Sequence, residues 1–231
     1  MLLYQLLKDF TGLVFPKTCL ACGGDIPGIE KYICPNCWMD IPKTNYHKEQ
    51  GNPVEQIFWG RIPVQYATSY FFYIKGSRYQ RLIHEMKYNG KKEIGYELGK
   101  KLGRELKNTS FEQVDYVVPV PLHKKKLKKR GFNQSEWIGK GISETLEQPL
   151  ATKNLYRAEY TTSQTKKSKY ERWLNVENVF KLNDPQFFSD KHVLLVDDII
   201  TTGATLEACA NAILQSKNAR VSIASLGFSD K

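Results

Sequence analysis

The chain has 231 residues, of which 41% are apolar and 25% charged, an ordinary globular composition that excludes wholesale disorder. At about 150 residues per domain, the length predicts one full-sized core plus a module too small to fold alone, and the lack of an apolar run of about 18 residues excludes a transmembrane segment. The net charge of +10 lies in the middle of the chain, where residues 61–110 carry 11 basic and 4 acidic side chains and residues 111–190 carry 14 and 10. This one-sided positive field favours a polyanionic partner, either nucleic acid or a phosphorylated metabolite.

The N-terminal segment is predicted to be a short amphipathic helix, because apolar side chains recur at helical spacing from Leu2 to Phe10. It lacks the basic start and small-residue cleavage site of a signal peptide, so we expect a cytoplasmic protein whose thiols stay reduced. Residues 1–45 are interpreted as this helix plus a four-cysteine module, residues 46–65 as a polar linker, and residues 66–231 as the main domain.

The four cysteines of the first module form two Cys-x-x-Cys pairs separated by eleven residues, at Cys19, Cys22, Cys34 and Cys37. Two such turns can supply the tetrahedral sulfur shell that a structural zinc ion prefers. Two disulfides or an iron–sulfur cluster are the alternative interpretations. A bound metal explains how so small a module is stabilised. The fifth cysteine, Cys209, is expected in the core.

Strands and helices alternate through the main domain. Strands are predicted at 66–74, 115–120, near 154–160, at 192–196 and at 220–226, and helices at 81–87, 92–106, 133–146 and 205–215. Residues 161–175 are expected to form a mobile loop. The alternation predicts an α/β fold with a mostly parallel central sheet flanked by helices.

The segment after Pro121 carries six positive charges in seven residues: Lys124, Lys125, Lys126, Lys128, Lys129 and Arg130. Like-charge runs usually stay in water, so a solvated loop is one interpretation. The other is a patch that contacts single-stranded DNA or a pyrophosphate group. Aromatic residues nearby in sequence (Phe132, Trp137, Tyr170 and Trp173) either stack on bases or belong to the core.

The most specific stretch is the strand that ends in Asp197 and Asp198, followed by Thr201, Thr202, Gly203, Ala204 and Thr205 and then a helix. Backbone amides at a helix N-terminus, with threonine hydroxyls around them, form a cradle for phosphate. Adjacent carboxylates accept hydrogen bonds from sugar hydroxyls or hold hydrated Mg²⁺. A buried strand followed by a capped helix also accounts for the threonines and the glycine, but not for two aspartates. The Walker and dinucleotide-binding glycine motifs are absent.

This stretch resembles the motif that binds phosphoribosyl pyrophosphate (PRPP) in type I phosphoribosyltransferases, and the whole chain resembles the ComF/GntX-like family, whose members carry a four-cysteine module before a phosphoribosyltransferase-type domain. Supporting segments occur in the same order: Leu82 to Tyr88, Val118 to Leu122, Arg130 to Gln134, Thr161 to Gln164 and Arg172 to Val176.

The resemblance implies a role for each matching position. Asp197 and Asp198 would bind the ribose hydroxyls, and Thr201 to Thr205 would hold the 5-phosphate. The pyrophosphate turn would comprise Val120, Pro121, Leu122, His123 and Lys124. Gln164 and Arg172 are candidate contacts of a closing lid, with Lys166-Lys167 standing where the family commonly has an apolar residue. Mg²⁺ would accompany PRPP and neutralise its charge.

Two functions follow as hypotheses. The first is a PRPP-binding protein of natural competence that binds single-stranded DNA and works with proteins of the DNA-uptake machinery. The second is an active phosphoribosyltransferase that transfers the sugar to an unidentified acceptor, as an amidophosphoribosyltransferase does. The sequence does not decide between them, because a fold does not fix a function.

Overall fold

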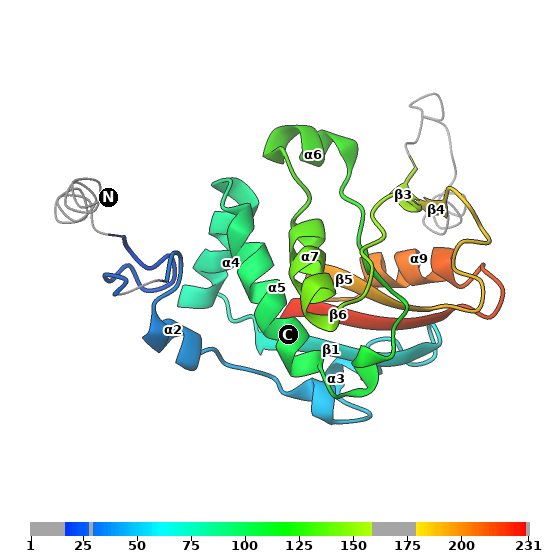
Figure 1. Cartoon of the computed structure of the whole chain (residues 1–231), viewed down its shortest axis with the longest axis horizontal. Helices are drawn as coiled ribbons and strands as arrows, with labels where there is room; N and C mark the ends of the chain where they lie inside the picture. Colours follow the sequence, from blue (N-terminus) through cyan, green and yellow to red (C-terminus); the bar gives the residue numbers. More distant parts are fainter. Residues whose placement is uncertain (1–16, 28–29, 159–178, 230–231) are drawn as a thin grey trace.

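A computed structural model describes residues 17–27, 30–158 and 179–229 (Figure 1). Its central sheet has four strands in the order β1-β6-β5-β2. All three pairings are parallel, which confirms the predicted sheet. The strands are β1 (Val64–Phe72), β2 (Tyr116–Pro119), β5 (His192–Ile200) and β6 (Arg220–Phe228). A small antiparallel pair, β3 (Leu155–Arg157) with β4 (Phe180–Leu182), lies outside this sheet.

Helices cover both faces of the sheet, as parallel strands with buried faces require. One face packs against α4 (Arg78–Tyr88), α5 (Lys92–Leu106) and α7 (Gln134–Leu146), and the other against α9 (Ala204–Ile213). Side chains of β5 alternate accordingly: Leu194 and Val196 enter the first core, and Val193 and Leu195 the second. The sheet therefore separates two hydrophobic cores.

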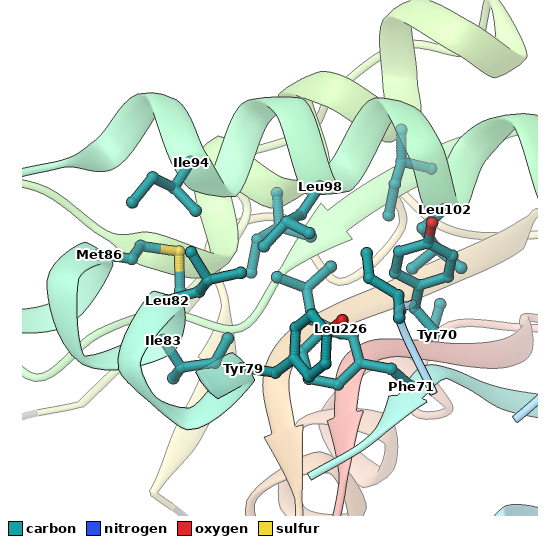
Figure 2. Close-up of a cluster of buried hydrophobic side chains, with 14 of the residues drawn as sticks. Tyr70, Phe71, Tyr79, Leu82, Ile83, Met86, Ile94, Leu98, Leu102 and Leu226 are labelled. Carbon is teal, nitrogen blue, oxygen red and sulfur yellow. The ribbon is translucent and has the colours of Figure 1, made fainter. Parts of the chain in front are cut away.

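The core on the α4–α5 face follows directly from the sequence pattern. The predicted apolar stripe of α5 is buried, and Figure 2 shows three of its members, Ile94, Leu98 and Leu102, beside Leu82 and Met86 of α4. Complete burial of one such side chain stabilises the fold by about 1.5–3 kcal/mol. This packing fixes the position of α4, whose last turn reaches the acid pair described below.

The four-cysteine module packs into this same core. It contains the short helix α2 (Pro35–Met39), and Cys19, Ile33 and Cys34 belong to the buried cluster that includes α4 and α5. The Tyr79 hydroxyl of α4 donates a 3.1 Å hydrogen bond to the Cys37 carbonyl. The module is thus joined to the sheet by shared side-chain packing.

Residues 46–65 differ from the predicted linker because they are folded against the sheet. They contain the 3-10 helix η1 (Tyr46–Lys48) and the short helix α3 (Pro53–Gln56). Val54 and Phe58 are fully buried, and Ile62 is 6% exposed. These three apolar residues recur every four positions, a helical spacing that the polar residues around them obscure. We call residues 53–62 the strap.

The basic run differs from its prediction as well. It forms a helix, α6 (Lys124–Arg130), where we expected a loop. The His123 Nδ1 caps its first turn by accepting a 3.1 Å hydrogen bond from the Lys125 amide, and Gly131 ends it at φ 79°. These two caps, together with the tolerance of lysine for helical geometry, outweigh the repulsion between its charges.

The remaining predicted elements are close to their predicted bounds, except that β5 runs on to Ile200. The short elements α2, β4 and η2 (Ser110–Glu112) were not predicted. The predicted helix at 2–10 and the loop at 161–175 lie outside the described residues. In the described part of the chain, no helix combines the length and the apolar character needed to cross a bilayer.

Candidate functional site

Asp197 and Asp198, which we call the acid pair, lie near the carboxyl end of β5, beside α7. Asp197 Oδ1 accepts a 2.8 Å hydrogen bond from the Ser135 hydroxyl and a 2.9 Å hydrogen bond from the Asp198 amide. Ser135 occupies the first turn of α7, and its neighbour Gln134 is 1% exposed with an Nε2 that has no partner among the described residues. The Ser135 hydroxyl and the Asp198 amide therefore fix the orientation of the Asp197 carboxylate.

The two carboxyl groups are not equivalent. Burial, followed by the charge of Asp198, raises the pKa of Asp197 to about 7, against the opposing hydrogen bonds from the Asp198 amide and Ser135 and the charge of Lys87. Asp197 is thus poised to exchange a proton near neutral pH. A group with such a shift in a cleft is a candidate functional residue.

Asp198 is paired with a lysine that the sequence interpretation did not assign to the site. Lys87 Nζ, from the last turn of α4, lies 2.9 Å from Asp198 Oδ2, and both side chains are mostly buried. The ammonium group partly offsets the repulsion between the two carboxylates, and its charge opposes the rise in the pKa of Asp197. Helix α4 therefore contributes a positively charged lysine side chain to the site near the end of β5.

The predicted phosphate loop connects β5 to α9. Thr201, Thr202 and Thr205 are exposed, and residues 199–206 line a small open hollow of about 50 Å³ together with Asp197. Gly203 precedes the first turn of α9 at φ 71°, in the left-handed region that favours glycine. Backbone amides at this helix start face an open hollow, which suits an anion such as phosphate.

Side chains of the strap contact the phosphate loop and fix its conformation. A Cβ added at Gly203 would lie 2.7 Å from Ile57 Cγ2 and 2.8 Å from Phe58 Cε1, so the strap leaves room for glycine alone. Arg61 donates a 2.9 Å hydrogen bond to the Thr202 carbonyl and forms an ion pair with Glu207 of α9. Sequence reasoning missed Arg61, because only the tertiary fold brings it to the loop.

The predicted pyrophosphate turn also lies beside the acid pair. The Val120 amide donates to the Val196 carbonyl at 2.9 Å, and the Asn133 side chain donates to the Val120 carbonyl at the same distance. Pro121, Leu122 and His123 follow, half-buried, and lead into α6. Because Val196 precedes Asp197, the turn starts next to the carboxylates, as the resemblance implied.

Helix α6 stands above this edge of the sheet (Figure 1). Its lysines are exposed. Arg130, at its end, stacks on the exposed ring of Tyr88 from α4, with 5.1 Å between the guanidinium carbon and the ring centroid. Trp137 is half-buried beneath two lysines, Lys92 at 4.6 Å and Lys140 at 5.3 Å, so its ring is already covered. Phe132 is half-buried, while Tyr170 and Trp173 lie outside the described residues.

The four cysteines of the module converge on one point. All four Sγ atoms lie within 4.8 Å of one another, and those of Cys22 and Cys34 are 3.8 Å apart. Tetrahedral thiolates at about 2.3 Å from a zinc ion are separated by about 3.8 Å, so the arrangement is consistent with zinc. The cysteines are free thiols, which disagrees with the disulfide alternative. Arg78 Nη1 lies 3.6 Å from Cys37 Sγ and adds a positive charge beside the thiolates.

Burial and hydrogen bonding act in opposite directions on the Cys19 thiol. At Cys19, burial raises the pKa, but backbone amides led by those of Cys22 and Cys34 outweigh it and lower the pKa to about 6. The Cys34 amide donates to Cys19 Sγ at 3.3 Å. A thiolate favoured in this way is a good metal ligand.

Comparison with known proteins supports the same reading. The profile of the phosphoribosyl transferase domain family matches residues 145–228, which include β5, the phosphate loop and α9. The DNA utilization protein YhgH of Escherichia coli is 28% identical over 201 residues, covering 84% of this chain and 83% of that protein. Competence protein F of Haemophilus influenzae is 27% identical over 202 residues (83% and 88%), and competence protein ComFC of Bacillus subtilis 25% over 206 residues (88% and 80%).

The chain thus carries a match to the phosphoribosyl transferase domain over residues 145–228 and is similar to ComF-type competence proteins over most of its length.

Solved structures with a similar fold are more distant. The glutamine PRPP amidotransferase of B. subtilis aligns with a TM-score of 0.42 and 21% identity, over 57% of this chain and 25% of that one. The purine phosphoribosyltransferase of Pyrococcus horikoshii aligns with a TM-score of 0.35 and 19% identity, over 59% and 73% of the two chains.

The fold of this ComF-like protein thus brings three predicted segments together: the acid pair, the phosphate loop and the pyrophosphate turn. Gln164 and Arg172, the predicted lid contacts, lie outside the described residues. Lys87, Ser135 and Arg61 are additions from the structure. Lys87 lies within a segment that carries the family resemblance, and Ser135 directly follows another, so the sequence offered a signal for both residues. No such segment includes Arg61.

Proposed function

We propose that this protein binds PRPP or a related ribose phosphate. The observation that carries the proposal is the convergence of a carboxylate pair and an open helix N-terminus at one edge of the sheet. The carboxylates suit the ribose hydroxyls, and the amides of residues 201–205 suit the 5-phosphate. Segment 191–231 is electrically neutral, so the loop relies on backbone amides to hold the phosphate.

Magnesium fits this site by the chemistry of its donors. Mg²⁺ prefers carboxylate and phosphate oxygens and keeps several of its waters. Asp197 and Asp198 offer such oxygens, although Lys87 already contacts one of them at 2.9 Å. When bound, the ion would neutralise charge on a pyrophosphate group. For the four-cysteine module we propose zinc, because its sulfur spacing matches that ion.

We further propose that the protein acts on single-stranded DNA in natural competence. The support is the names of the relatives, two of which are competence proteins and one a DNA utilization protein, together with α6. Its exposed lysines are placed to contact a sugar–phosphate backbone. We expect proteins of the DNA-uptake machinery as partners.

Isothermal calorimetry with PRPP and Mg²⁺ tests the ribose-phosphate proposal. Wild-type protein should bind, and the Asp197→Asn/Asp198→Asn double variant should lose binding by at least tenfold. Asp190→Asn is the matched control, because Asp190 is an exposed acid at φ 58°, where asparagine is well tolerated. Absence of wild-type binding would overturn the proposal. Pyrophosphate release on addition of candidate acceptors would select the active-transferase hypothesis.

A further inference from the structure

A large cavity lies away from the phosphate loop, between α4 and the four-cysteine module. It is open to solvent on one side and has a volume of about 960 Å³. Ala21 and Cys22 of the module form one wall, Gly76 and Ser77 the end, and the outer face of α4 the other wall. The inner face of α4 packs in the core (Figure 2), and Ile83 belongs both to that core and to the cavity wall, whereas the lining residues Arg81, His84 and Tyr88 are outside the core cluster.

The cavity is cationic. Arg78, Arg81 and Lys87 line it, and none of the lining residues is acidic. Arg78 is engaged with Cys37 and Asp40, and Lys87 with Asp198. Arg81 has no hydrogen-bond or ion-pair partner in the part of the chain that the structure describes. An exposed guanidinium in a cavity without acids is a ready contact for a phosphate group.

An aromatic face lies next to this charge. Arg81, His84 and Tyr88 occupy positions i, i+3 and i+7 of α4, so they share one side of the helix. The rings of His84 and Tyr88 are 4.7 Å apart, and Tyr88 is 58% exposed. Exposed aromatic rings beside arginine are typical of surfaces on which nucleobases stack.

We propose that this cavity binds a nucleoside monophosphate unit, with its phosphate on Arg81 and its base against the Tyr88–His84 face. The volume exceeds what a phosphate alone would fill, and the two groups are arranged along one helix face. The unit is either a free nucleotide or one residue of a single strand. Contact between Arg130 of α6 and Tyr88 joins the basic helix to the rim of the cavity, which gives a strand a continuous path.

The cavity is also connected to the acid pair. Lys87 lines the cavity and at the same time contacts Asp198. A phosphate in the cavity attracts the Lys87 ammonium group and so frees Asp198 for the ribose hydroxyls or Mg²⁺. This coupling, unlike the nucleotide site itself, rests on the proposed ribose-phosphate function. It predicts that nucleotide and PRPP–Mg²⁺ each increase the affinity of the other.

Calorimetry of the zinc-loaded full chain with deoxyadenosine monophosphate tests the site. We expect binding that weakens about tenfold in Arg81→Gln and in Tyr88→Leu, and that is undetectable with deoxyadenosine, which lacks the phosphate. The matched control is Arg104→Gln, which removes an exposed arginine of α5 outside the cavity. Circular dichroism should show the same folded content in all variants.

A second titration with oligothymidylate distinguishes the two sources of the ligand. If the cavity receives one unit of a strand, Arg81→Gln weakens oligonucleotide binding about tenfold while the mononucleotide binds poorly. If it receives a free nucleotide, only the mononucleotide is affected. Either result supports the site, whereas equal affinities of wild type, Arg81→Gln and Arg104→Gln for both ligands would overturn it.

The coupling has its own measurement. Wild-type protein should bind deoxyadenosine monophosphate several-fold more tightly when saturated with PRPP–Mg²⁺, and Lys87→Met should abolish that difference. An equal affinity with and without PRPP–Mg²⁺ in wild type would contradict the coupling. If PRPP–Mg²⁺ does not bind at all, the proposed function fails, while the Arg81-dependent nucleotide site stands on its own titration.

Discussion

Asp197 shows how strongly the position of one residue changes its chemistry. Two adjacent aspartates in water would both be ionised at neutral pH. In the folded chain, burial and the charge of Asp198 raise the pKa of Asp197 to about 7, while Lys87 Nζ forms an ion pair with Asp198 at 2.9 Å. The charge of Asp197 therefore depends on pH near neutrality. A pKa shifted in this way is typical of functional carboxylates.

Replacement of Asp197 by asparagine should stabilise the protein at high pH while it weakens ligand binding. The carboxyl has a pKa near 4 when unfolded and near 7 when folded, so its contribution to stability is lost as pH rises through that window. We expect Asp197→Asn to raise the free energy of unfolding at pH 8 by at most about 4 kcal/mol, which corresponds to about three pKa units, and to have little effect at pH 4. Urea unfolding at both values measures this, with Asp190→Asn as the control. Equal effects at the two pH values would contradict the account.

At the scale of elements, the strap is the unexpected part of the site. The sequence of residues 53–62 predicts a polar linker. In the structure, however, Phe58 is fully buried against the phosphate loop, and Arg61 donates a hydrogen bond to the Thr202 carbonyl. The loop is thus shaped between α9 and a segment more than 140 positions away in sequence. Because the strap already fixes the conformation of the loop, the ligand does not have to order it, and no binding free energy is lost to that ordering.

Gly203→Ala tests this support. The substitution places a Cβ at φ 71° and within 2.8 Å of two strap side chains, whereas Gly90 has nearly the same φ and nothing within 4 Å of the added atom. Gly90→Ala therefore isolates the backbone strain, which is about 1 kcal/mol. We expect Gly203→Ala to cost at least about 1 kcal/mol more in thermal unfolding, and to reduce PRPP affinity, which Gly90→Ala should not. Equal losses of stability in the two variants would show that the strap does not crowd a Cβ at position 203.

Helix α6 gives a second prediction at this scale. Its positions are exposed and basic, so each phosphate it neutralises contributes about 0.7 to the salt slope of single-strand binding. Replacement of Lys125, Lys126, Lys128 and Lys129 by glutamine should lower that slope by two or more and weaken binding at low salt. A control with the same charge change replaces the exposed lysines Lys48, Lys153, Lys181 and Lys217. If the two quadruple variants have the same slope, α6 is not the DNA-binding element.

At the scale of the whole molecule, the four-cysteine module and the sheet share one core. Cys19 and Cys34 are buried in the cluster that holds α4 and α5, and Tyr79 bonds the module directly. The metal site, the cavity and the acid pair therefore lie along one helix, α4. A change in the module is transmitted to α4 through packed side chains.

Metal removal should accordingly lower the stability of the whole chain in one transition. We expect chelation, or Cys34→Ser, to reduce the midpoint of thermal unfolding and keep a single calorimetric peak, because the core is continuous. Cys209→Ala is the control, since Cys209 is buried in the other core and should leave the metal content unchanged. A separate low-temperature peak for the module would show that it unfolds independently.

The sequence predicted the elements with strong periodicity and failed where contacts are long-range. Helix 92–106 was predicted at its observed bounds, because its apolar stripe is regular. The acid pair and the phosphate loop could be predicted as a candidate site because their residues are adjacent in sequence. Two contacts of the site join segments that are distant in sequence: the ion pair of Lys87 with Asp198, and the hydrogen bond of Arg61 to Thr202. The local sequence pattern does not predict such contacts. The helix at 124–130 differs from the predicted loop because the His123 and Gly131 caps offset the repulsion between its lysines.

The central claim is that Asp197, Asp198 and the loop at 201–205 form one ribose-phosphate site. A crystal structure of the full chain soaked with PRPP and Mg²⁺ tests it most directly. We predict the 5-phosphate within hydrogen-bond distance of the backbone amides of residues 201–205, and the ribose hydroxyls within hydrogen-bond distance of the two carboxylates. A 5-phosphate bound elsewhere, or ribose turned away from both aspartates, would contradict the account.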